Sequence, residues 1–137
     1  RTLPIIALNP MPQHNPPQIT IQVETAYIES QSIPEKDHYV FSYTVTVRNS
    51  GQQAARLLGR HWVITDANGK VQEVVGEGVV GKKPLIGPGE DFSYTSGTSL
   101  ETPVGSMHGK YQMRSETGEH FDAPIPPFTL AIPRSLH

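Results

Sequence analysis

Three glycines and two lysines form the stretch of this chain whose spacing points most clearly to chemistry: Gly76, Gly78, Gly81, Lys82 and Lys83. The glycines match G-x-G-x-x-G, the pattern with which dinucleotide-binding proteins end a strand and begin a helix. The N-terminus of that helix binds the pyrophosphate. Here residues 84–89 read Pro-Leu-Ile-Gly-Pro-Gly, and these breakers forbid the helix. The loop therefore predicts no useful affinity for NAD or ATP.

A weaker anion site remains open at the same loop. Successive backbone N–H groups in a glycine turn can form a concave nest for an anion, and Lys82 and Lys83 add positive charge. Exposed charges of this kind contribute only about 0–1 kcal/mol each, and salt screens them. We therefore predict that phosphate or pyrophosphate binds no more tightly than roughly millimolar. The simpler interpretation is that the glycines let a strand end, bulge and turn.

Two histidines have neighbours that suit a metal ion or proton transfer. His120 and Asp122 share a strand face by period two, and a His–carboxylate pair can bind a divalent cation weakly. That pair keeps a metal-dependent phosphohydrolase open as an alternative, although the sequence has no H-E-x-x-H motif. His61 adjoins Trp62 in a strand, and we expect it to be packed or paired within the sheet.

Composition narrows the function classes. The 137 residues include no cysteine, which excludes disulfides, thiolate zinc sites, iron–sulfur clusters and cysteine nucleophiles. A net charge of -2 argues against general attraction to nucleic acid, and no apolar run nears the roughly 20 residues of a membrane span. We expect a cytoplasmic protein with no cofactor, no nucleic-acid partner and no membrane insertion.

The elements that must position these groups are strands. Alternation of apolar and polar residues, with period two, recurs at 19–24, 39–48, 92–95 and 107–114. A β-branched run over residues 54–65 meets the hairpin turn Asn68-Gly69. About eight short strands with Pro and Gly turns, and without helical periodicity, predict an all-β sandwich of two antiparallel sheets.

The same alternation predicts the core. Trp62, Phe41, Tyr43 and Val45 come from the two strands with the clearest inward faces. In the strand that contains Trp62, we expect Leu58, Trp62 and Ile64 to lie on one face. Near the end of the chain, we expect residues 120–123 and the run from 128 to 132 to form separate strands on either side of Pro124-Ile125-Pro126-Pro127.

The first residues of the chain differ from the rest. Residues 1–18 are rich in proline and have no packing pattern, so they predict an extended, poorly ordered arm. Residues 19–137 predict a single domain, because a chain of this length can bury one core of its own.

Taken together, the motifs of residues 19–137 resemble one family. They are Tyr39-x-Phe41-x-Tyr43-x-Val45, Arg60-His61-Trp62-x-Ile64-Thr65-Asp66-x-Asn68-Gly69, Val74-x-Gly76-x-Gly78-Val79-Val80-Gly81, Tyr94-Thr95-Ser96-Gly97 and the tail Pro133-Arg134-x-Leu136-His137. This combination is similar to the bacterial ApaG domain. The resemblance covers nearly the whole domain and leaves out residues 1–18.

The resemblance implies a fold and a kind of function. It implies a fibronectin type III-like sandwich, no established enzymatic activity and an association with cobalt and magnesium tolerance. Related domains of eukaryotic F-box proteins and of a DNA-polymerase-interacting protein imply a module that binds a protein partner. The family offers no agreed catalytic residues, so none is carried over.

Overall fold

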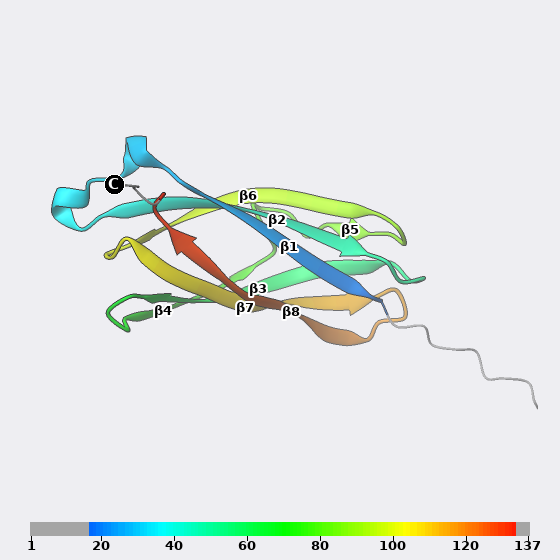
Figure 1. The fold of residues 1–137 in the computed structure, drawn as a ribbon. Coiled ribbons are helices and arrows are strands. Elements are labelled where there is room, and N and C mark those ends of the chain that lie inside the picture. The colour runs from blue at the N-terminus through cyan, green and yellow to red at the C-terminus, as the bar shows by residue number, and fades with distance from the viewer. Residues whose placement is uncertain (1–16, 134–137) are drawn as a thin grey trace, which may run out of the picture.

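The computed structural model describes residues 17–133 as a series of strands joined by short turns (Figure 1). In chain order the elements are β1 (Ile19–Tyr27), the 3-10 turns η1 (Glu29–Gln31) and η2 (Pro34–Lys36), β2 (Tyr39–Asn49), β3 (Ala55–Asp66), β4 (Val71–Glu77), β5 (Leu85–Ile86), β6 (Asp91–Leu100), β7 (Val104–Ser115) and β8 (His120–Ala131). Residues 1–16 of the predicted arm lie outside this range, so the boundary at residue 18 stays a prediction.

The strands form two antiparallel sheets that face each other. One sheet has the order β1-β2-β6, and the other has the order β4-β3-β7-β8, with β5 also paired to β3. Figure 1 shows them as two layers, with β1, β2 and β6 in one and β3, β4, β7 and β8 in the other. The predicted all-β, fibronectin type III-like sandwich is confirmed. The Asn68-Gly69 hairpin is also confirmed, because Thr65 pairs with Val71 across it and Gly69 has a φ of 84°.

The core lies between the two layers and is centred on Trp62. Trp62, Phe41, Tyr43 and Val45 are all buried, as the alternation predicts. The Trp62 ring centroid lies 5.3 Å from that of Tyr43, 6.2 Å from that of Tyr111 and 5.8 Å from that of Phe128, each in an edge-on arrangement. Edge-to-face pairs suit the charge distribution of aromatic rings. Trp62 therefore joins β3 to β2, β7 and β8.

A β-bulge in β3 overturns one expectation. The register with β7 shifts between Leu57, which pairs with Met113, and Gly59, which pairs with Gln112. The inserted residue is Leu58, which is half-buried, whereas Leu57 is fully buried in the core. The prediction that Leu58 shares a face with Trp62 is therefore wrong, because one extra residue reverses the side to which the following residues point.

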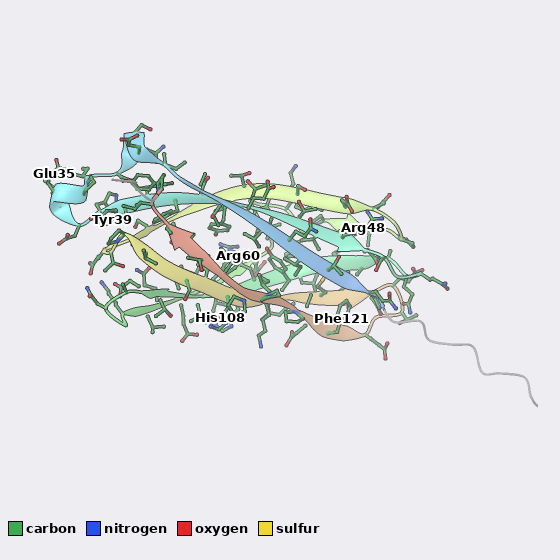
Figure 2. All side chains as sticks on the ribbon, viewed as in Figure 1. Glu35, Tyr39, Arg48, Arg60, His108 and Phe121 are labelled. Carbon is green, nitrogen blue, oxygen red and sulfur yellow. The ribbon has the colours of Figure 1, made fainter. Side chains whose placement is uncertain are left out.

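The bulge also places a charged residue between the sheets. Beyond it, Arg60 pairs directly with Tyr111, whose side chain is fully buried. Directly opposed residues of an antiparallel pair project from the same face of the sheet. Arg60 therefore projects inward with Trp62, and Figure 2 shows it between the two layers.

The last strand also differs from expectation. β8 runs without interruption through the three prolines, so the prediction of two separate strands is wrong. A register shift opposite β7, between Met107 and Gly109, accommodates the extra residue. β8 is an edge strand, and an edge tolerates residues that lack an N–H donor.

The two sides of the sandwich are closed differently. On one side β1 and β8, the edge strands of the two sheets, are in contact (Figure 1). The other edge strands are β4 in the large sheet and β6 in the small sheet. The glycine loop, residues 76–83, begins in the last two residues of β4 on this second side.

Candidate functional site

The glycine loop continues the chain from the end of β4, at the opposite end from the Asn68-Gly69 turn, and contains a tight turn of its own. Val79 and Lys82 exchange two backbone hydrogen bonds, of 2.8 Å from the N–H of Val79 and 2.9 Å from the N–H of Lys82. The two residues between them, Val80 and Gly81, have φ angles of 44° and 78°. Positive φ at both central residues is the geometry of a type I′ hairpin turn. Valine adopts it at a cost, because its branched Cβ crowds the backbone there.

These bonds use several of the groups that an anion nest would need. The N–H of Gly78 donates to the carbonyl of Leu58 at 2.8 Å, so the N–H groups of Gly78, Val79 and Lys82 all have backbone acceptors. Gly78 has a φ of 61°, and a Cβ there would overlap the carbonyl oxygen of Lys82. The five predicted anion-binding residues lie along the end of β4 and the turn that follows it, with Gly76 in the strand and Lys83 just past the turn. That they bind phosphate stays a prediction.

The charge of Lys83 is already matched. Its Nζ lies 3.0 Å from Glu77 Oε1, and its backbone carbonyl accepts a 2.7 Å hydrogen bond from Arg56 Nη1. The bond and the charge of Lys83 lower the pKa of the exposed Glu77 carboxyl, which is therefore ionised at neutral pH. The Glu77 carboxylate thus offsets one of the two lysine charges that a phosphate would use.

Arg60 explains the first glycine of the motif. Its Nη1 donates to the carbonyls of Glu77 and Gly78, at 3.0 Å and 2.9 Å. A Cβ at Gly76 would come within 2.7 Å of the guanidinium carbon and of both terminal nitrogens. Gly76 is therefore the residue that lets the flat guanidinium lie against the backbone of β4.

A cavity of about 310 Å³ opens between the sheets at this point. It is lined by Arg60 from β3, Glu77 from β4, the turn residues 79–81, Tyr43 from β2, and Tyr94 and Ser96 from β6. The cavity therefore combines one cation, two aromatic rings and a hydroxyl with the valine side chains of the turn. Strands from both sheets contribute to it.

A hydrogen-bonded pair of tyrosines lies behind this cavity. The hydroxyl groups of Tyr94 and Tyr111 bond to each other between the layers. Burial raises the pKa of Tyr94 to about 12, despite the opposing effects of this bond and of the Arg60 charge. Burial also raises the pKa of Tyr111. Both hydroxyls are therefore neutral at physiological pH, and neither is prepared to act as a base.

His61, His108 and His120 lie on the outer face of the large sheet, away from this cavity. His120 is exposed opposite Arg114, and Asp122 Oδ2 lies 3.3 Å from Lys110 Nζ. His61 Nε2 lies 2.7 Å from Glu73 Oε1, which confirms that it is paired within the sheet. Figure 2 shows His108 on this outer face too.

Within residues 17–133, no three side chains of His, Cys, Asp or Glu gather as a metal ion would require. The pair His120 and Asp122, proposed from period two, therefore lacks a third protein ligand in this part of the chain. Binding of a cation by the pair alone stays a prediction. The same range contains no helix that is long and apolar enough to cross a membrane.

Sequence reasoning missed Arg60, although a signal for it was present. Leu57 and Trp62 are five positions apart, and residues an odd number apart cannot share a face of a regular strand. Both are apolar, and a glycine lies between them, which is typical of a bulge. A bulge near Gly59 would have turned Arg60 inward.

Comparison with known proteins identifies close relatives. The family model described as the ApaG domain matches residues 29–115, more than half of the chain. The Protein ApaG of Azoarcus sp. strain BH72 is 61% identical over 120 residues, which are 88% of this chain and 94% of that protein. The Protein ApaG of Escherichia coli O1:K1 is 54% identical over 123 residues, or 90% of this chain and 98% of that one.

A solved structure shares the fold as well. The crystal structure of an ApaA protein from Bordetella pertussis superposes with a TM-score of 0.85 at 48% identity. The match covers 88% of this chain and 98% of that one. The sandwich described above is therefore the same fold as that of the Bordetella protein.

Proposed function

The chain belongs to the ApaG family, and on that premise we propose that it is a non-enzymatic module that binds an extended segment of a partner protein along strand β4. β4 pairs with β3 on one side only, so its other side offers main-chain N–H and C=O groups. A partner segment can add to such an edge as a further strand, with affinity from main-chain hydrogen bonds.

The observation that carries this proposal is the apolar character of that edge. Five large apolar residues of β4, of the turn that follows it and of β5 are exposed, and we call them the edge patch: Val71, Val74, Val75, Val80 and Leu85. Val75 is 72% exposed and Val80 is 54% exposed. Contiguous exposed apolar patches mark interaction surfaces.

The charge of the edge also favours docking. β4 contains no proline, and its central carboxylate, Glu73, is held by His61 on the neighbouring strand. Natural sheets protect free edges with prolines, lysines and inward charges. β4 uses none of these three, which supports the proposal that another chain covers it.

The proposal includes a link to divalent-cation homeostasis. The link rests on the family resemblance alone. Because the described residues hold no group of three metal ligands, we propose that the protein affects cobalt and magnesium tolerance through its partner and not by storing the ion. The proposed site of action is the cytoplasm.

Binding is tested with a matched pair of variants. Val75→Lys places a charge on the edge patch, whereas Val104→Lys makes the same change at a valine that is 45% exposed and pairs with Ala131 on β8. The parent and both variants are used to capture proteins from native lysate. A protein that binds the parent and Val104→Lys, but not Val75→Lys, is purified as the candidate partner. We expect this partner to protect the β4 amides from hydrogen exchange. Protection elsewhere, or equal capture by both variants, would contradict the proposal.

The link to cations has a separate test. A deletion strain should lose tolerance of cobalt, and Val104→Lys should restore it while Val75→Lys should not. If deletion leaves cobalt and magnesium tolerance unchanged, the link is wrong and the docking proposal still stands on the exchange experiment.

A further inference from the structure

We propose that the cavity beside the turn of residues 79–81 is a binding site for a small organic acid, in which the Arg60 guanidinium binds the carboxylate and the rings of Tyr43 and Tyr94 border the rest of the ligand. The proposal concerns the space between the sheets and does not depend on docking at β4.

The first argument is the state of the Arg60 charge. The ion pairs among residues 17–133 include Arg48 with Asp91 at 2.7 Å, but none of them includes Arg60. Arg60 bonds instead to two neutral carbonyls through Nη1 alone. A guanidinium that projects between two sheets is costly to desolvate unless a negative group meets it. A carboxylate in the cavity would supply that group.

The second argument is that the side chain is held in place. Its guanidinium lies against Gly76, the two carbonyls hold Nη1, and β3 carries it inward only because of the bulge at Leu58. A fixed planar fork of N–H donors matches the two oxygens of a carboxylate and loses little freedom on binding it. Preorganisation of this kind distinguishes a site from a solvated surface arginine.

The third argument concerns the side chains that line the cavity beside Arg60. The lining includes the rings of Tyr43 and Tyr94 and the buried side chain of Val79. Aromatic rings beside a few converging polar groups are typical of sites for small organic ligands.

The volume is consistent with this class of ligand. A cavity of about 310 Å³ lies at the lower end of the range for small-molecule sites, which is roughly 300–1,000 Å³. It suits an aromatic or branched acid better than a nucleotide. We expect an affinity on the order of millimolar for a fragment with a single carboxylate.

The test compares three probes: benzoate, its neutral amide benzamide, and inorganic phosphate. Each is titrated into the protein while the backbone amide signals of Val79–Gly81 and Ser96 are followed by NMR. We expect benzoate to saturate these shifts, and benzamide and phosphate to bind about tenfold more weakly or worse. The absence of saturation by benzoate, equal binding of benzamide, or tighter binding of phosphate would overturn the proposal.

Variants then locate the site. Arg60→Gln should abolish benzoate binding, whereas Arg48→Gln, which removes an exposed and paired arginine, should leave it unchanged. Binding by Arg60→Gln that equals the parent's would contradict the role of Arg60.

A second pair of variants, at Val80, tests the proposal even if Arg60→Gln does not fold. Val80 lines the cavity with a φ of 44°, a conformation that Asp and Asn adopt more readily than Val. Val80→Asp adds a like charge and should weaken benzoate binding about fivefold or more. Val80→Asn, the same shape without charge, should keep it within about twofold. Equal affinities of the two variants would overturn the proposal.

Discussion

The two edges of the five-stranded sheet are protected in opposite ways. β8 contains Pro124, Pro126 and Pro127, which cannot donate hydrogen bonds, and it lies in contact with β1 of the other sheet. β4 has no proline and exposes every residue from Val71 to Val75. The first edge resists pairing with another chain, whereas the second is suited to it.

The difference extends into the space between the sheets. Behind β8 the layers meet through packed rings such as Tyr43 and Phe128, whose centroids are 6.4 Å apart. Behind β4 the layers enclose Arg60, two tyrosine hydroxyls and a cavity. One side of this sandwich is therefore built for stability, whereas the polar and exposed groups are concentrated on the other.

The largest expected effect comes from truncating Trp62, which contacts both sides of the sandwich. Trp62 pairs with Val74 on β4 and packs on Phe128 of β8. Trp62→Ala should lower the free energy of unfolding by about 3–5 kcal/mol, the usual range for truncating a buried aromatic. Urea denaturation measures the loss. Amides of β4 and β8 should lose exchange protection together; an unchanged midpoint would mean that Trp62 does not join the two sides.

The next effect is a pH dependence that comes from the β4 and β6 side. The pKa of Tyr94 is raised from 10 to about 12, so the folded state holds this proton more tightly than the unfolded state. The stabilisation is full below pH 10 and is lost as the pH rises through 12. We expect the titration of Tyr94 to lower the free energy of unfolding by up to about 1.4 kcal/mol per pH unit in this window. Denaturation at several pH values measures the slope, and Tyr94→Phe should reduce it.

A smaller loss of stability should distinguish two glycines, one just before the turn and one within it. Gly78→Ala meets both a positive φ and the carbonyl of Lys82, so it should cost about 1–3 kcal/mol. Gly81→Ala has the positive φ but open space around it, and should cost only about 1 kcal/mol. Thermal melts compare the two variants directly. Equal losses would indicate that the turn shifts to relieve the clash, and that the β4 side is more adaptable than we infer.

The smallest expected effect lies on the exposed edge itself. Val75→Lys and Val104→Lys should each change the free energy of unfolding by less than about 0.5 kcal/mol, because both side chains are exposed. Chemical denaturation of the two proteins is the measurement. A loss of several kcal/mol for Val75→Lys alone would show that Val75 is part of the core and that the edge patch is not free.

Much of the fold could be predicted from residues close together in the chain. The alternation in β2, the turn at Asn68-Gly69 and the burial of Trp62 all follow from it, because side-chain period and turn chemistry are local properties. The prolines after Lys83 likewise exclude a nucleotide-binding helix without reference to the fold. The identity of the glycine loop as a turn was therefore determined by the sequence itself.

Tertiary structure decided which groups the loop meets. One inserted residue, Leu58, reverses the direction of Arg60, and the register with β7 shows which residue is inserted. The role of Gly76 as the seat of a guanidinium, the free edge of β4 and the cavity bounded by Tyr43 and Ser96 depend on strands distant in the chain. Period and turns are set by neighbouring residues, but contacts across a sandwich are set by register and packing, which no local pattern specifies.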